Sequence, residues 1–139
     1  MRRLNMEYPK RKPLKKKQRE ALYNKYNGHC AYCGCEITYE EMQADHIESI
    51  HRTEIKRYRC VDSLSDKELN AIENYMPACR QCNFYKGVYT IDTFRNALKT
   101  MLWRNLKQNF NYRMALKYGL ITENDKDIQF YFEKCEEEQ

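Results

Sequence analysis

Cys79-Arg80-Gln81-Cys82-Asn83 and Cys30-Ala31-Tyr32-Cys33 each contain a Cys-x2-Cys pair. Four thiolates in two such pairs complete the tetrahedral coordination of Zn²⁺ and leave no open position for water. The spacing therefore predicts a structural zinc site held by Cys30, Cys33, Cys79 and Cys82. Because zinc binding in small domains is coupled to folding, with a free energy on the order of 10 kcal/mol, the two segments should meet at the metal. The alternative is four unrelated reduced cysteines, which two correctly spaced pairs disfavour.

The total of seven cysteines indicates a reducing compartment rather than a disulfide framework. Cys35, Cys60 and Cys135 lack metal-site spacing, and we predict that they are bystanders. No run of 18 apolar residues occurs, and the first residues lack the apolar region of a signal peptide. We therefore expect a soluble, intracellular protein of one domain or one domain plus a tail, with no membrane contact.

Charge is distributed unevenly along the 139 residues. Residues 1–28 carry ten Lys or Arg and two Glu, a balance of +8, whereas residues 121–139 carry seven acids and two Lys, a balance of −5. The basic end should attract polyanions, so Lys15, Lys16 and Lys17 are candidate DNA contacts. A solvated tail explains the same charges equally well. The acidic end cannot lie along a phosphate backbone.

An Asp45-His46 dyad lies between the two cysteine pairs, and Asn83 directly follows the last cysteine. A histidine with an ordinary pKa of about 6.5 can take a proton from water at neutral pH. Carboxylate and amide oxygens are suitable ligands for Mg²⁺. The three residues therefore favour metal-assisted phosphodiester hydrolysis. Taken separately, the dyad is more often a local hydrogen bond and an Asn after a cysteine is more often a helix cap.

Local patterns predict an α+β chain with three parts: a basic arm over 1–14, a core over 15–95 and a helical extension with an acidic tail over 96–139. We expect a strand over 43–47, a polar excursion around 48–73, and an aromatic strand or ordered clip over 128–132. A capping box predicts a helix that starts at Ser65 and ends near Tyr75, before Pro77. The other expected helices span 15–26, 80–88, 90–106 and 112–118.

The order of these motifs resembles the HNH endonucleases, whose core is a treble-clef-like ββα-metal fold, here with a zinc site of four cysteines and with flanking helices. The resemblance covers roughly residues 22–95 and extends to the small phage-type members. It is carried by the two cysteine pairs, Asp45-His46-Ile47, the segment 74–83 and Lys86-Gly87. A bacterial or phage-infected cytoplasm is the compartment that the resemblance implies.

The resemblance implies a role for each matching residue. His46 would be the general base, Asp45 a ligand of a catalytic Mg²⁺ or Mn²⁺, and Asn74 the residue that braces the base. Asn83 stands where many members have histidine, and it would be a neutral oxygen ligand favouring hard Mg²⁺ or Mn²⁺. The implied reaction leaves 5′-phosphate and 3′-hydroxyl ends. His51 is a more distant histidine that we interpret as a surface residue.

Further DNA contacts are expected from the basic excursion and from the second cysteine segment: Arg52, Lys56, Arg57, Arg59 and Lys86. The alternatives are a solvated loop for the first four and a helix-surface lysine for Lys86. We expect DNA as the main partner and a phage protein as a candidate second partner. The expected oligomeric state is a monomer or a transient dimer. Two rival functions remain: a zinc module that binds nucleic acid without cleaving it, and an adaptor whose acidic, aromatic tail docks a protein.

Overall fold

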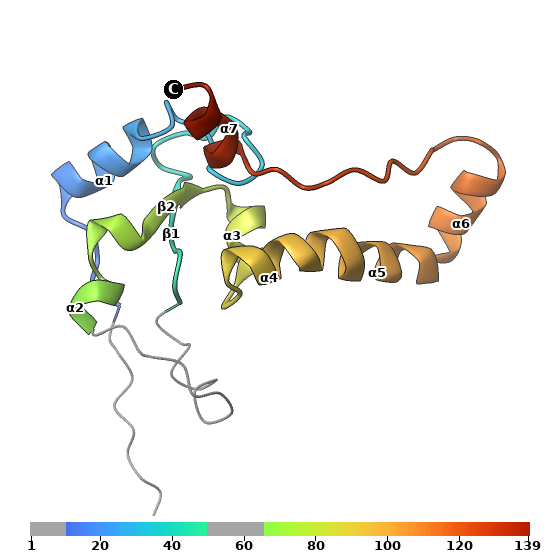
Figure 1. Ribbon diagram of the computed structural model, residues 1–139, viewed down its shortest axis with the longest axis horizontal. Coiled ribbons are helices and arrows are strands. Elements are labelled where there is room, and N and C mark those ends of the chain that lie inside the picture. Colours follow the sequence, from blue (N-terminus) through green and yellow to red (C-terminus); the bar gives the residue numbers. More distant parts are fainter. Residues whose placement is uncertain (1–10, 50–65) are drawn as a thin grey trace, which may run out of the picture. The chain divides into compact units, whose positions relative to one another are not determined.

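The computed structural model describes residues 11–49 and 66–139, and it divides into two compact units (Figure 1). The first unit comprises Met1–Thr90 together with Phe130–Gln139, and the second comprises Ile91–Gln129. The C-terminal ten residues therefore belong to the first unit, whereas the sequence placed them in a separate extension. Within the described residues, no helix combines the length and the hydrophobicity that a membrane span requires.

The first unit contains a two-stranded antiparallel sheet of β1 (Gln43–His46) and β2 (Tyr75–Ala78). Gln43 pairs with Ala78 and His46 with Tyr75, so the dyad lies at the end of β1 beside the start of β2. The strand expected over 43–47 is confirmed. Together with the helices around it, this small sheet makes the protein α+β, as the sequence predicted.

The helix expected to run to Tyr75 is wrong in its extent. Helix α2 (Asp66–Leu69) is only four residues long, the 3-10 turn η3 (Ile72–Asn74) follows, and the chain then enters β2. Pro77 lies inside β2 because a strand in a two-stranded sheet bonds to its partner along one edge only. The carbonyl of Pro77 accepts a bond from the Ala31 amide at 2.8 Å. The predicted cap at Ser65 lies outside the described residues.

Helix α1 (Lys16–Asn24) ends two residues before the predicted limit at Tyr26, and the chain turns at the predicted stop, Asn27-Gly28. Asn27 and Gly28 both adopt a left-handed conformation, with φ of 51° and 71°. A side chain at Gly28 would meet the Tyr23 hydroxyl at 2.7 Å, so glycine is required for both conformation and space. The turn directs the chain into the first cysteine pair.

Helix α3 (Arg80–Lys86) follows β2 directly and confirms the helix expected over 80–88. Cys79 is its N-cap, and the Cys79 sulfur accepts a bond from the Cys82 amide. The order strand, strand, helix therefore carries Asp45 and His46 on β1, Cys79 after β2, and Asn83 on α3.

The C-terminal segment packs against the first cysteine turn (Figure 1). The amides of Tyr131 and Phe132 donate to the carbonyls of Tyr32 and Ala31 at 3.0 and 2.9 Å. Phe130 is 2% exposed and meets the Tyr32 ring edge to face. Residues 128–130 form no strand, and Tyr131–Glu137 is helix α7. The ordered aromatic clip is thus the alternative that the structure supports, through Phe130.

The second unit is helical. Helix α4 (Ile91–Asn96), the π turn η4 (Ala97–Met101) and helix α5 (Leu102–Gln108) follow one another where a single helix was expected. Helix α6 (Phe110–Lys117) is followed by the predicted stop at Gly119, whose φ is 68°. The edge of the Trp103 ring packs against Tyr112 within this unit. The Arg95 guanidinium binds the Ile128 carbonyl at 2.7 Å and ties the returning chain to α4.

Candidate metal centre and active site

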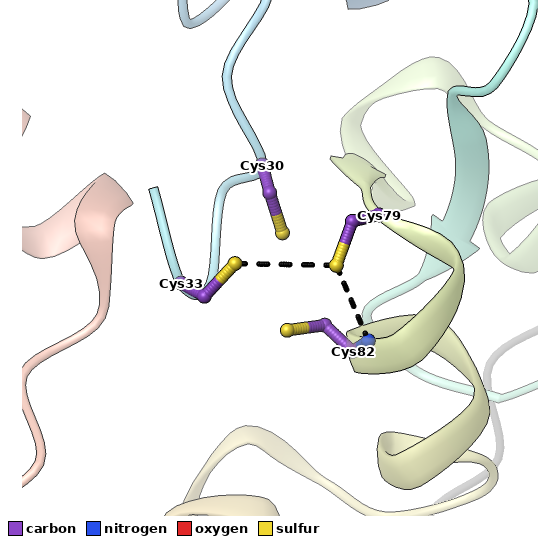
Figure 2. A group of neighbouring side chains, drawn as sticks. All are labelled: Cys30, Cys33, Cys79 and Cys82. Carbon is purple, nitrogen blue, oxygen red and sulfur yellow. Dashed lines mark hydrogen bonds between the residues drawn. The ribbon is translucent and has the colours of Figure 1, made fainter. Parts of the chain in front are cut away.

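The four paired cysteines come together around one point (Figure 2). Cys30 and Cys33 lie on a turn, Cys79 directly follows β2 and Cys82 lies on α3, and all four sulfurs are within 4.8 Å of one another. The sulfurs of Cys33 and Cys79 are 3.9 Å apart. Tetrahedral zinc with bonds of about 2.3 Å places its sulfurs about 3.8 Å apart, so a small contraction would fit the ion. The residues present match a structural zinc site.

Within the cluster, Cys30 favours the thiolate, whereas burial raises the pKa of Cys33 and the hydrogen bond with Cys30 raises the pKa of Cys82. A hydrogen bond from the Cys82 side chain, opposed by burial, lowers the pKa of Cys30 to about 4. Cys35 lies outside the set of four and is exposed, and partial burial together with contacts to Cys33 raises its pKa to about 12. Cys35 therefore stays a neutral thiol, in keeping with its prediction as a bystander. Cys60 lies outside the described residues.

Asp45 is 4% exposed and contacts two other side chains. Its Oδ2 accepts a short hydrogen bond from the Tyr32 hydroxyl and lies 3.1 Å from Lys86 Nζ. Burial raises the pKa of Asp45, while the Lys86 charge and the Tyr32 hydroxyl oppose that rise. Burial and the nearby Asp45 raise the pKa of Tyr32 far above its usual range, so its hydroxyl remains a donor.

Lys86 has a different place from the one that the sequence suggested. Its side chain is fully buried, pairs with Asp45 and donates to the His46 carbonyl at 2.7 Å. The interpretation as a helix-surface lysine is therefore wrong, because α3 turns this residue towards β1. A phosphate contact would require the ammonium to leave both partners, and we do not propose one.

His46 is 8% exposed at the end of β1. Its ring centroid lies 4.4 Å from that of Tyr75, the residue opposite it on β2. The backbone on both sides of the ring is held as well, by Lys86 at the His46 carbonyl and by the Asn74 carbonyl, which accepts from the Ile47 amide at 2.8 Å. The ring and its backbone are thus fixed from three directions.

Asn74 is buried and holds the chain after His46. Its Oδ1 accepts from the Glu48 amide at 2.9 Å, and its Nδ2 donates to the carbonyls of Glu48 and Leu69 at 3.0 and 2.9 Å. A side-chain amide has both a donor and an acceptor, so Asn can satisfy both backbone groups of one residue. This geometry links η3 to the segment that follows the dyad.

Three residues of the predicted catalytic site share one cavity, whereas the fourth, Asn74, does not line it. The cavity has a volume of about 220 Å³, and its lining includes Asp45, His46 and Asn83. The remaining lining residues are Arg11, Ala44, Ser49, Gly87 and Val88. Sequence reasoning did not assign Arg11 to the site, because only the fold shows that residue 11 lies beside β1.

Among the described residues, the predicted DNA contacts Lys15, Lys16 and Lys17 do not line this cavity. Lys15, Lys16 and Lys17 are at the start of α1, where Lys16 and Lys17 are exposed. Arg52, Lys56, Arg57, Arg59 and His51 lie outside the described residues. Their predicted roles remain predictions.

Comparison of the sequence with protein-family models gives no match, and no curated protein matches it either.

Proposed function

We propose that the protein is a metal-dependent endonuclease of the HNH type that hydrolyses DNA phosphodiester bonds. The observation that carries the proposal is the cavity shared by Asp45, His46 and Asn83. It lies next to the four-cysteine cluster, because Asn83 directly follows the cluster residue Cys82. A carboxylate, an imidazole and an amide are the groups that metal-assisted hydrolysis requires.

A hard cation fits the residues of this cavity. The contacts that Tyr32 and Lys86 make with Asp45 both fall on Oδ2, and in this proposal Oδ1 is the oxygen that binds the metal. Asn83 adds an amide oxygen from the facing helix. Mg²⁺ prefers such oxygen ligands, few of them from protein, and keeps several waters. When bound, Mg²⁺ or Mn²⁺ would neutralise phosphate charge and stabilise the leaving oxygen.

His46 is the residue we assign as general base. A base must present its ring at a fixed angle to the attacking water, and a loss of positioning lowers the rate steeply. Tyr75, Lys86 and Asn74 each restrain the ring or the backbone that carries it. Asn74 therefore acts as a positioning residue in this proposal, through the segment 47–48.

The cysteine cluster has a structural role in the proposal. Four thiolates occupy every position of tetrahedral zinc, so the ion would not activate water. It would instead join the first cysteine turn to α3 and thereby place Asn83 opposite β1. Zinc and the hard catalytic metal would thus have separate ligand sets.

Cleavage of supercoiled plasmid by the purified protein tests the proposal. We expect nicked or linear DNA with Mg²⁺ or Mn²⁺, and none without an added divalent ion. His46→Ala should abolish cleavage, whereas the matched control His51→Ala should cut as well as wild type. An active, folded His46→Ala variant would show that the base is assigned wrongly. The ratio of nicked to linear product reports whether one strand or both are cut.

A second variant tests the role of Asn83 as the neutral ligand of the catalytic metal. Asn83→His should retain cleavage and extend the choice of metal towards softer ions such as Ni²⁺. Complete loss of cleavage with every metal would show that Asn83 makes a contact other than metal ligation. Zinc content should be unchanged, because residue 83 is not one of the four sulfur ligands.

The rival function is a zinc module that binds nucleic acid without cutting it. One observation favours it: Lys86 already neutralises Asp45 inside the protein. This rival predicts DNA binding that is independent of Mg²⁺ and no product under any condition. The adaptor function receives less support, because Phe130 of the aromatic tail is buried in the first unit.

A further inference from the structure

Arg11 lies between two cavities of the first unit. One is the cavity lined by Asp45, His46 and Asn83, and the other has a volume of about 480 Å³. Arg11 and Ala44 line both. The remaining lining of the second cavity is Lys12, Pro13, Leu14, Arg19 and Tyr75. The two hollows are therefore neighbours that share one cationic side chain.

The charges around the second cavity favour an anion. Among the described residues, its lining contains three cationic side chains and no carboxylate. Arg19 is already used, because its guanidinium donates to the carbonyls of Tyr39 and Met42 at 2.8 Å each. Arg11 and Lys12 are exposed, so their charges are available to a ligand. Arg11 also opposes the rise in the pKa of Tyr75 that burial produces.

Arg11 retains most of its binding capacity. Its one hydrogen bond within the described part of the chain is a long one to the Ala44 carbonyl, at 3.4 Å. A guanidinium has five N–H donors in a planar fork that matches two oxygens of a phosphate. In the catalytic cavity the Asp45 charge is already balanced by Lys86, so Arg11 supplies a further cation there.

The segment 11–14, which carries Arg11, is held in place. The Lys12 amide donates to Asn70 Oδ1 at 3.3 Å, and the Tyr75 hydroxyl donates to the same oxygen at 3.4 Å. Asn70 follows α2 and Tyr75 begins β2, so the segment 11–14 is tied to the elements that carry the site. The segment 11–14 therefore forms a wall of the second cavity rather than a free tail.

We propose that Arg11 binds a phosphate of the DNA strand at the mouth of the catalytic cavity, and that the second cavity holds the nucleotide next to it. This inference rests on the proposed function for the identity of the ligand, a nucleic-acid strand. A nucleotide offers both the phosphate charge that Arg11 and Lys12 would bind and an apolar sugar and base that would contact Pro13 and Leu14. Arg11 thereby fixes the path of the strand relative to His46.

Equilibrium binding separates this proposal from cleavage. Fluorescence anisotropy with a short labelled single-stranded DNA, without added Mg²⁺ or Mn²⁺, measures affinity across a salt series. Arg11→Ala should weaken binding about fivefold at about 50 mM salt and lower the slope of log K against log salt by about 0.7, the value for one lost phosphate contact. Arg11→Lys should recover part of the affinity, since it keeps the charge and loses the fork.

The matched control is Arg104→Ala, which removes one exposed arginine from α5 in the second unit. We expect it to change affinity less than about twofold and to leave the salt slope unchanged. Equal effects of Arg11→Ala and Arg104→Ala would overturn the proposal, because charge alone would then explain binding. Unaltered zinc content and circular dichroism show that each variant is folded.

The two proposals can fail independently. If wild type binds DNA through Arg11 and cuts no plasmid, the subsite stands and the endonuclease function falls. If wild type cuts plasmid while Arg11→Ala binds and cuts normally, the subsite falls and the function stands.

Discussion

Lys86 Nζ lies 3.1 Å from Asp45 Oδ2, and the two side chains are 0% and 5% exposed. A buried ion pair contributes little net stability compared with apolar residues, but removing one partner leaves the other charge unpaired. Lys86→Met should therefore destabilise the protein by about 3–5 kcal/mol. Urea unfolding followed by circular dichroism measures the change.

The double variant Asp45→Asn with Lys86→Met tests the reason for that loss. Because it removes both charges, we expect it to be more stable than Lys86→Met alone. Lys16→Met is the matched control, since its pair with Glu20 is exposed and should change stability by less than about 0.5 kcal/mol. If the double variant is as unstable as the sum of its single variants, the pair is not coupled.

We predict that zinc is held by the four clustered cysteines and not by Cys35. Cys33→Ser should lose the bound zinc and unfold the first unit, because three thiolates remain and the metal joins two distant segments. Cys35→Ser should retain one zinc per chain, since Cys35 lies outside the set. Zinc released to a colorimetric chelator gives the stoichiometry. Loss of zinc from Cys35→Ser would place that sulfur among the ligands.

Asn74 makes three side-chain hydrogen bonds, two of them to Glu48 and one to Leu69. Asn74→Ala leaves buried backbone groups without partners, so the free energy of unfolding should fall by about 1–3 kcal/mol. Cleavage should fall more than stability explains if Asn74 positions His46. The measurement is plasmid cleavage at a temperature where unfolding data show the variant to be fully folded.

Asn74→Asp serves as the control for that experiment. It retains an acceptor for the Glu48 amide but turns a carboxylate oxygen towards the carbonyls of Glu48 and Leu69, so it should be at least as unstable as Asn74→Ala. Cleavage equal to wild type in folded Asn74→Ala would remove the positioning role and leave a purely structural one.

Short-range signals in the sequence predicted much of this fold. The strand over 43–47, the helix stop at Asn27-Gly28 and the cluster of four cysteines all depend on residues close in sequence or on a fixed ligand count. The predicted ligand and base residues share a cavity because each lies within a few positions of the sheet or of a cysteine.

The features that the sequence did not reveal depend on distant contacts. In the sequence, Pro77 indicates the end of a helix, and only its pairing with Ala44 shows that it lies in a strand. From sequence, a lysine on a helix is expected at the surface. Only the packing of α3 on β1 buries Lys86 beside Asp45. From sequence, Arg11 is expected in a solvated arm. Its place beside the cavity depends on its hydrogen bond to Ala44 and on the one between Lys12 and Asn70, which are distant in sequence.

Phe130 connects the end of the chain to the first cysteine turn. It is 2% exposed, and its ring meets those of Tyr32 and Phe132 with centroids 5.4 and 5.9 Å away. Phe130→Ala should destabilise the first unit by about 3–5 kcal/mol, because the lost ring leaves a cavity that the neighbouring side chains fill only in part. Urea unfolding of the zinc-loaded protein measures the change.

Phe84→Ala is the control for the same measurement, since that ring is 86% exposed on α3 and its removal should leave stability within about 0.5 kcal/mol of wild type. The comparison also tests the adaptor function, which uses the aromatic tail to dock a partner. A tail reserved for a partner would tolerate Phe130→Ala in the isolated protein. A large loss of stability would instead place Phe130 in the core that holds Tyr32, and through Tyr32 the carboxylate of Asp45.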